Sequence, residues 1–418
     1  MKKLALLFPG QGSQFVGMGK ELCENFQVAR ETFEEANESL GFDIKKLCFE
    51  GSMEELTKTE NTQPAILTAS VAAFRVYMDE IGVEPLYCAG HSLGEISALT
   101  CSGAIKFADG VKIVNRRGKF MQEAVAIGVG GMAAVSGVDV KVIEEECAKV
   151  STEGNIVVIS NYNSPAQIVI SGHKGAVDAA GQALEQAGAR IIPLKVSAPF
   201  HSPLMQPAAD KLGEELKGYT FYDLKYPVIS NVTASPYEGK DSIIENLSLQ
   251  IVKPVQWIDS VKYLEEQGIE FAIELGPKTV LKNLMKKNTK SIETYSYDKE
   301  ADVKAVKEEL LPNAGQVDKF KLLTRSLAIA VCTRNTNWDN DEYQKGVVEP
   351  YRNIQQIVEE LEKENKEPDM EQMQAALDML TSVFKTKGTP KEEQVERFNQ
   401  LFDETGTRDL FPDFRMPE

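Results

Sequence analysis

Short apolar runs alternate with helical patterns up to about residue 125 of this 418-residue chain. The runs Leu4–Phe8 and Leu86–Ala89 have the length and the flanking turn residues of buried strands. Apolar residues recur at helical spacing near Phe15–Cys23, in Ala65–Met78 and in the segment that follows Ser92. Strands that alternate with helices in this way predict an α/β domain built around a parallel sheet.

The pattern changes between about residues 128 and 194. The expected strands there are Gly131–Ser136, Ile156–Asn161, Ala166–Ser171 and Arg190–Leu194, and the expected helices are Lys141–Val150 and Gly175–Ala187. Their order, βαββαβ, is that of a ferredoxin-like unit. Strand-like runs of the first kind resume at 226–230, 271–274 and 292–295. The small unit is therefore predicted to be inserted into the α/β domain.

From about residue 318 the chain has helical periodicity almost throughout. We expect helices at Asp318–Cys332, Pro350–Lys363, Glu371–Phe384 and Pro390–Phe402, two of which open with a proline, a residue favoured at the first helical position. Aromatic and apolar side chains, Trp338 among them, are sufficient for a small helical core. The predicted organisation is a discontinuous α/β domain (1–127 and 196–312), a ferredoxin-like domain (128–195) and an all-α C-terminal extension (313–418).

Composition narrows the class of protein. The 42% hydrophobic and 26% charged content is ordinary for a soluble globular chain, and a net charge of −17 argues against general nucleic-acid binding. The first apolar run is cut short by Pro9-Gly10-Gln11-Gly12, and no segment approaches the length of a membrane-spanning helix. Six scattered cysteines fit small buried side chains in a reducing compartment better than a disulfide frame or a zinc site. A cytoplasmic protein without a bound metal is expected.

The segment Gly90-His91-Ser92-Leu93-Gly94 has the Gly-x-Ser-x-Gly pattern of a nucleophile elbow. A predicted strand precedes it and a predicted helix follows, so Ser92 would sit on a sharp turn at a helix N-terminus, where free N–H groups can stabilise an oxyanion. So short a pattern also arises by chance in a chain with 30 glycines. The strand and helix around it favour the functional reading, and acyl transfer is the leading hypothesis.

An elbow serine needs a base, and the chain has only three histidines. His91 adjoins Ser92, so its side chain is expected to line the site or to pack. His173 is expected in a solvated loop of the small domain. His201 lies in a proline-bracketed loop where the two domains rejoin, which is a common place for catalytic residues. Elimination makes His201 the candidate base for Ser92.

Several motifs then occur in one order along the chain. They are Pro9–Gln14, Gly90–Glu95, Arg117–Gly118, Gly131–Val135, Asn163–Gly172, Ala198–Ser202 and Glu274–Pro277. In this order they resemble the malonyl-CoA:acyl carrier protein transacylase family over about the first 300 residues. The resemblance implies an α/β-hydrolase-like domain with an inserted ferredoxin-like domain, in agreement with the pattern of elements.

The resemblance also implies roles for individual residues. Ser92 would be the acylated nucleophile and His201 its base, with Gln250 orienting the histidine through its backbone or its side chain. Gln11 and Leu93 would supply backbone N–H groups to the oxyanion hole. A Ser–His pair of this kind needs no triad carboxylate.

Substrate selectivity is assigned to Arg117 by the same resemblance. A planar guanidinium can hold the free malonyl carboxylate through two hydrogen bonds, which a lysine cannot reproduce. Phe200 resembles the bulky residue of malonyl-selective members and should disfavour an α-methyl branch by roughly 10–200-fold. His91 and Met121 are expected to line the same pocket.

The implied reaction is a ping-pong transfer of malonyl from malonyl-CoA to the phosphopantetheine thiol of acyl carrier protein, which supplies fatty acid synthesis and needs no bound cofactor. Two alternatives stay open: a discrete acyltransferase of a polyketide pathway, and a serine acyl hydrolase with water as the acceptor. The helical extension departs from the family, whose members usually end near residue 310. It could be an interaction module, for instance one that makes a homodimer, or a helical annex packed on the catalytic domain.

Overall fold

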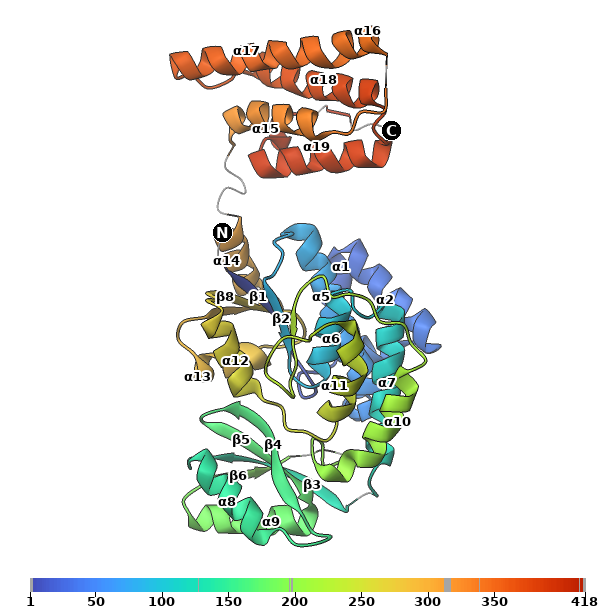
Figure 1. Ribbon diagram of the computed structural model, residues 1–418, viewed down its shortest axis with the longest axis vertical. Coiled ribbons are helices and arrows are strands. Elements are labelled where there is room, and N and C mark those ends of the chain that lie inside the picture. The colour runs from blue at the N-terminus through green and yellow to red at the C-terminus, as the bar shows by residue number, and fades with distance from the viewer. Residues whose placement is uncertain are drawn as a thin grey trace. The chain divides into compact units, whose positions relative to one another are not determined.

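The computed structural model describes residues 3–126, 128–194, 196, 198–311, 317–337, 339–412 and 414–415 (Figure 1). These residues form two compact units, which divide between Val306 and Lys307. Residues 127, 195 and 312–313, at the predicted domain boundaries, and Trp338 lie outside the described residues. The predicted boundaries therefore stay predictions.

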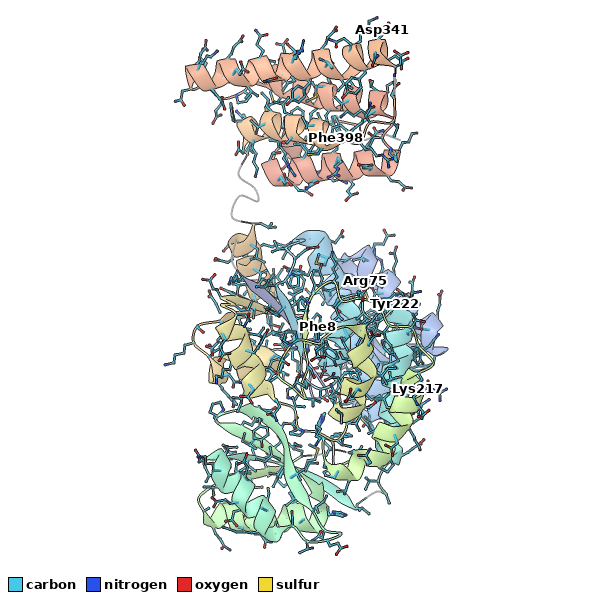
Figure 2. All side chains as sticks on the ribbon, in the orientation of Figure 1. Phe8, Arg75, Lys217, Tyr222, Asp341 and Phe398 are labelled. Carbon is cyan, nitrogen blue, oxygen red and sulfur yellow. The ribbon has the colours of Figure 1, made fainter. Side chains whose placement is uncertain are left out.

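A five-stranded parallel sheet forms the centre of the first unit. Its strands, in the spatial order β7-β2-β1-β8-β9, are β7 (Val228–Ile229), β2 (Tyr87–Gly90), β1 (Leu4–Phe8), β8 (Phe271–Glu274) and β9 (Glu293–Ser296). Every residue of β1 is buried, as expected for a strand covered on both faces. Phe8, labelled in Figure 2, ends this strand inside the unit. The predicted parallel α/β architecture is confirmed.

Helices cover both faces of this sheet (Figure 1). The helices up to the division between the units are α1 (Lys20–Asn25), α2 (Gln27–Leu40), α3 (Ile44–Glu50), α4 (Met53–Thr57), α5 (Thr59–Glu80), α6 (Leu93–Cys101), α7 (Phe107–Glu123), α10 (Gln206–Leu216), α11 (Ile243–Gln250), α12 (Trp257–Glu266), α13 (Val280–Asn288) and α14 (Glu300–Leu310), which contains the division itself. The helix expected near Phe15–Cys23 begins only at Lys20. Gly17 and Gly19 have φ of 99° and 78°, a left-handed conformation that ends any helical path before them.

A four-stranded antiparallel sheet makes up the inserted small domain. Its strands, in the order β4-β5-β3-β6, are β4 (Val157–Ser164), β5 (Gln167–His173), β3 (Gly130–Ser136) and β6 (Arg190–Pro193), with α8 (Val140–Val150) and α9 (Lys174–Gln186) packed on one face. This order confirms the ferredoxin-like arrangement. Val255 of the large domain joins β4 by accepting from Tyr162 N–H and donating to the Ser160 carbonyl, both at 2.9 Å. The two domains therefore share backbone hydrogen bonds.

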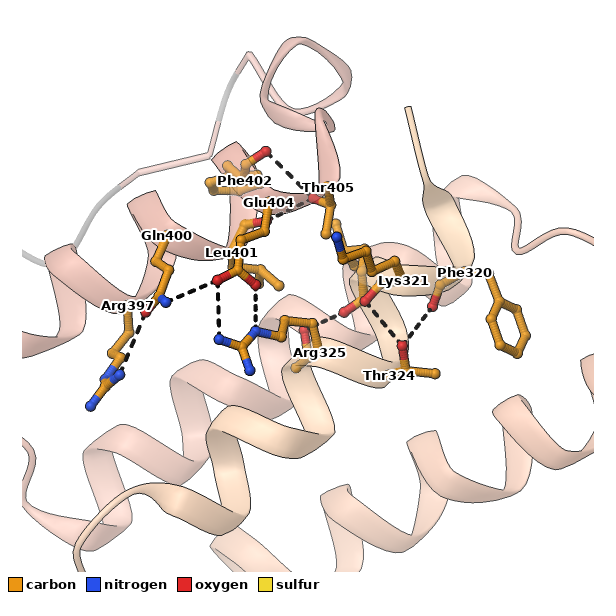
Figure 3. Close-up of polar contacts among 12 residues, drawn as sticks. Phe320, Lys321, Thr324, Arg325, Arg397, Gln400, Leu401, Phe402, Glu404 and Thr405 are labelled. Carbon is orange, nitrogen blue, oxygen red and sulfur yellow. Dashed lines mark hydrogen bonds and ion pairs between the residues drawn. The ribbon is translucent and has the colours of Figure 1, made fainter. Parts of the chain in front are cut away.

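The second unit is all-helical, as predicted. It contains α15 (Lys319–Cys332), α16 (Asn340–Tyr343), a π-helical segment (Gln344–Val348), α17 (Glu349–Glu364), α18 (Met370–Lys387) and α19 (Lys391–Thr405) around a core of its own. Phe398, labelled in Figure 2, is fully buried in that core. Arg325 of α15 and Glu404 of α19 are joined by two hydrogen bonds, of 2.5 and 3.1 Å (Figure 3).

The helix predicted to open at Pro350 instead belongs to a helical path that starts at Asn340. A proline inside a helix leaves the carbonyl four residues before it without its N–H partner. That carbonyl, of Gly346, accepts from the Ser382 hydroxyl at 2.9 Å instead. Because Ser382 of α18 supplies this hydrogen bond, the proline can lie inside the helical path and need not begin it. In the part of the chain that the structure describes, no helix is long and apolar enough to cross a membrane.

Candidate active site

Ser92 lies on a sharp turn between β2 and α6, with φ 52° and ψ −106°. This left-handed φ is uncommon for a residue with a side chain and marks a strained position. The flanking glycines are required by close packing. A Cβ on Gly90 would collide with the backbone of Gly94, and a Cβ on Gly94 would collide with the Phe8 carbonyl at the end of β1. The segment therefore has the shape of a nucleophile elbow.

The imidazole of His201 faces the Ser92 hydroxyl, with 2.8 Å between Nε2 and Oγ. Its Nδ1 lies 2.7 Å from the backbone carbonyl of Gln250. A carbonyl can only accept, so Nδ1 carries the proton and Nε2 is free to accept one from the serine. Burial, and to a lesser degree the positive charge of Arg117, lowers the pKa of His201 to about 3. The ring is therefore neutral at physiological pH, which is the form that a general base requires.

The other two histidines occupy different environments. His91 points its Nε2 at the Asn163 side-chain oxygen, 2.7 Å away, and lines the pocket that contains Ser92. His173 ends β5 and accepts from the Ile156 N–H at 3.0 Å, with no place in that pocket. Of the three histidines, His201 is the one in contact with Ser92.

Arg117 projects from α7 into the interior and is 1% exposed. Nη1 donates to Gln63 Oε1 at 2.8 Å, while Nη2 donates to Gln250 Oε1 at 2.9 Å and to Ser92 Oγ at 3.3 Å. Burial lowers the pKa of Arg117 to about 10, so the guanidinium remains charged at neutral pH. Among the described residues it donates to no carboxylate, and its Nε has no partner. The carboxylate that interacts with it, Glu95, is separated from it by the Gln250 side chain. A buried cation with no direct anionic partner suits an anionic group that arrives with the substrate.

Gln250 connects these groups with a buried carboxylate. Its Nε2 donates to the backbone carbonyl of Ser92 at 3.0 Å and to Glu95 Oε2 at 2.5 Å. Glu95 is fully buried and also accepts from the Tyr237 hydroxyl and from the Asn231 N–H. Burial raises the pKa of Glu95 to about 7, against the lowering effect of these hydrogen bonds. The side-chain oxygen of Gln250 therefore faces Arg117, and its side-chain nitrogen faces Glu95.

A cavity of about 180 Å³ opens beside Ser92. It is lined by Gln11, Gln63, His91, Ser92, Leu93, Arg117, Met121, Phe200 and His201 from the large domain and linkers, and by Met132, Asn161, Asn163, Val169, Leu194 and Val196 from the small domain and its exit. The structure therefore brings together around the cavity every site residue named from the sequence except Gln250. Gln250 does not line the cavity but is hydrogen-bonded to two residues that do, Arg117 and His201. The backbone N–H groups of Gln11 and Leu93 donate to no other group in the described part of the chain.

Sequence reasoning missed three polar side chains that hold these groups. Asn231 accepts from the Ser92 N–H at 2.6 Å and donates to the Gly90 carbonyl at 2.7 Å, so it fixes the elbow from the side. Gln63 and Glu95 hold Arg117 and Gln250 as described above. The one available signal was Gln63, a polar residue that opens the long apolar stretch of α5 and is buried there.

Comparison with known proteins identifies the family of this chain. A sequence model of the acyl transferase domain matches residues 5–330. A Bacillus subtilis protein named malonyl CoA-acyl carrier protein transacylase is 41% identical over 396 residues, which is 94% of this chain and 99% of the relative. A Salmonella typhimurium protein of the same name is 50% identical over 288 residues, 69% of this chain and 93% of its own length. The chain belongs to the malonyl-CoA:acyl carrier protein transacylase family.

Solved structures of this family have the same fold. An acyl carrier protein S-malonyltransferase from Vibrio cholerae superposes with a TM-score of 0.70 at 44% identity, covering 73% of this chain and 99% of its own. A malonyl-transacylase in complex with a type II polyketide synthase acyl carrier protein gives 0.71 at 43% identity, over 73% and 99%. The Bacillus subtilis relative matches a larger share of this chain, 94%, so its match extends into the helical extension. This family member is an acyltransferase.

Proposed function

We propose that Ser92 carries a malonyl group from malonyl-CoA to the phosphopantetheine thiol of an acyl carrier protein. One observation carries the proposal: Ser92 Oγ lies between a neutral His201, at 2.8 Å, and the buried cation of Arg117, at 3.3 Å. A base on one side and a cation on the other fit a thioester that ends in a carboxylate. The names of the relatives and the carrier-protein complex support the same donor and acceptor.

The first half-reaction forms an ester on Ser92. His201 Nε2 takes the hydroxyl proton as Oγ attacks the thioester carbon, and the N–H groups of Gln11 and Leu93 stabilise the oxyanion. Collapse of the tetrahedral intermediate breaks the carbon–sulfur bond, and His201 returns the proton to the departing CoA sulfur. The carrier-protein thiol then repeats these steps on the ester and regenerates Ser92.

Selectivity for malonyl rests on Arg117 and on the size of the cavity. The guanidinium already has polar partners at Nη1 and Nη2, so it is held in one orientation before the substrate binds. Phe200 and Met121, 8% and 2% exposed, line the same small space and limit the room for an α-methyl branch. The expected discrimination from one methyl group is about 10–200-fold.

The product would supply fatty acid or polyketide synthesis. The same site serves either pathway, and one matched structure contains a polyketide carrier protein.

We place the reaction in the cytoplasm, a reducing compartment in which the six free cysteines are stable. For the helical extension we propose an interaction module, because it has a hydrophobic core of its own. Comparing the solution mass of the full chain with that of residues 1–311 tests whether it mediates self-association.

Intact-mass analysis after mixing with malonyl-CoA tests the nucleophile. We expect one malonyl adduct on the wild type and none on Ser92→Ala. A malonyl adduct on both proteins would rule out Ser92. The isolated adduct is then offered either holo-carrier protein or buffer alone. Rapid transfer to the carrier with slow release to water supports the transferase, whereas rapid release to water regardless of the carrier identifies a hydrolase.

A further inference from the structure

The loop that follows β1, Pro9–Gln14, is packed tightly against the elbow. A Cβ on Gly10 would collide with the carbonyl oxygen of His91, so no other residue fits there without displacing the elbow. A Cβ on Gly94, in the first turn of α6, would collide with the carbonyl group of Phe8 and would lie 3.0 Å from the carbonyl oxygen of Pro9. The position of Gln11 relative to Ser92 is thus fixed by backbone contacts on one side of the loop.

The other side of the loop is held by its own side chains. Ser13 is fully buried, and its hydroxyl donates to the Gly10 carbonyl at 2.8 Å, where the Ser13 N–H also donates at 3.3 Å. Gln14 is 5% exposed and accepts from the Gly12 N–H at 2.7 Å. Gly12 has φ 105°, a conformation that favours glycine. Two polar side chains therefore turn back onto the two peptide groups that flank Gln11.

The bond from Ser13 has a direct consequence for Gln11. The Gly10 carbonyl and the Gln11 N–H belong to the same peptide group, which is trans. In a trans peptide the carbonyl and the N–H point in opposite directions. When Ser13 holds the carbonyl on its own side, the Gln11 N–H must point the other way. That N–H has no partner among the described residues, and Gln11 lines the cavity beside Ser92.

We propose that Ser13 is a positioning residue for the oxyanion hole: its hydroxyl fixes the peptide plane that carries the Gln11 N–H. Gln14 holds the next peptide plane, between Gln11 and Gly12, and limits rotation about the Gln11 backbone. Preorganised donors of this kind stabilise the transition state because they need no reorganisation when charge develops on the oxygen. The inference rests on the proposed function, in which both half-reactions pass through an oxyanion at this place.

The chain provides a closely matched control for Ser13→Ala. Ser102 is also fully buried, and its hydroxyl donates at 2.8 Å to the carbonyl three residues before it, that of Leu99. Ser102 follows the far end of α6, away from the elbow. Ser13→Ala and Ser102→Ala therefore remove the same kind of bond, one beside the oxyanion hole and one distant from it.

The experiment measures single-turnover acylation of Ser92 at saturating malonyl-CoA and at saturating acetyl-CoA. For Ser13→Ala we expect both rate constants to fall by the same factor, about 10-fold, with the malonyl preference unchanged. In Ser102→Ala, Ser92 should be acylated at the wild-type rate, although this variant should lose about as much thermal stability as Ser13→Ala. A fluorophosphonate probe, which lacks both carboxylate and CoA, should react with Ser13→Ala more slowly by the same factor, because its phosphoryl oxygen occupies the same hole. Gln14→Met is expected to change all three rates in the same direction.

Equal acylation rates for Ser13→Ala and Ser102→Ala would overturn the inference, as would a loss confined to malonyl-CoA. Failure of the proposed function gives different results. If Ser92 is not the nucleophile, the wild type itself forms no acyl adduct there, whatever residue occupies position 13. If the protein is a hydrolase, the wild-type adduct forms and is released to water regardless of the carrier protein.

Discussion

Arg117 donates through Nη2 to the side-chain oxygen of Gln250, at 2.9 Å. The backbone carbonyl of the same glutamine accepts from His201 Nδ1, at 2.7 Å. One residue at the end of α11 therefore orients both the group proposed to bind the malonyl carboxylate and the group proposed to act as base. The Gln250 side chain contacts the Arg117 guanidinium, and its backbone contacts the His201 imidazole. A substitution that changes only the side chain can therefore separate the two roles.

Gln250→Ala tests this separation. Alanine keeps the backbone carbonyl that holds His201 but removes the amide that holds Arg117. A hydrogen bond to a charged group contributes about 1.5–3 kcal/mol, so we expect kcat/KM for malonyl-CoA to fall by roughly 10–100-fold. Acetyl-CoA has no carboxylate to bind, and its kcat/KM should change much less. The same side chain also donates to the backbone carbonyl of Ser92, so an equal loss with both donors would show instead that it supports the elbow.

Arg117→Lys tests whether the shape of the cation matters in addition to its charge. Lysine keeps the positive charge but cannot donate to Gln63, Gln250 and a carboxylate from one plane. We expect kcat/KM for malonyl-CoA to fall at least about 10-fold, and Arg117→Ala to fall further while acetyl loading improves relative to malonyl. Competition between the two donors in one reaction, read by intact mass, gives the ratio directly. An unchanged ratio in Arg117→Ala would remove the arginine from substrate recognition.

Glu95 should make the stability of the catalytic unit depend on pH. Burial raises its pKa in the folded protein to about 7, above the ordinary value of 4.5, so the folded state holds the proton more tightly than the unfolded state does. The stabilising effect of protonation is fully present below about pH 4.5 and is lost as the pH rises through about 7. Compared with Glu95→Gln, which stays neutral, the wild type should lose up to about 3 kcal/mol of unfolding free energy across this range.

Chemical denaturation of both proteins at several pH values measures this difference. His201 titrates in the opposite sense, because burial lowers its pKa to about 3, but its contribution is common to both proteins and cancels in the comparison. A difference between the two proteins that does not vary with pH would mean that Glu95 has the same proton affinity in the folded and unfolded states.

Phe398→Ala tests whether the helical extension is an independent unit. The side chain is fully buried and packs against Phe384 and Phe414, with ring centroids 5.4 and 4.9 Å away. Its removal should destabilise the extension by about 3–5 kcal/mol. Acylation of Ser92 should be unaffected, because the cavity is lined entirely by residues of the first unit. Arg352→Ala, an exposed change in the same extension, serves as the control; reduced acylation in Phe398→Ala alone would show that the two units are coupled.

Local sequence signals predicted the elements well where one signal dominated. Leu4–Phe8 is a buried strand from end to end, and the glycines around Ser92 produce the turn that their spacing indicated. The proline rule misplaced one helix start, because Ser382 of another helix replaces the hydrogen bond that Pro350 cannot make. A contact between residues so far apart leaves no trace in the local pattern.

The sequence by itself determined which side chains could carry the chemistry. An elbow serine and only three histidines reduced the base to one candidate, because few residue types can accept a proton at neutral pH. Only the tertiary structure decided how the site is held. Gln63, Glu95 and Asn231 lie on separate segments. They hold Arg117, Gln250 and the Ser92 N–H, respectively, through hydrogen bonds to partners distant in the chain. Each is a polar residue whose function depends on what packs against it, and periodicity specifies only which face of an element is buried, not which partner it meets.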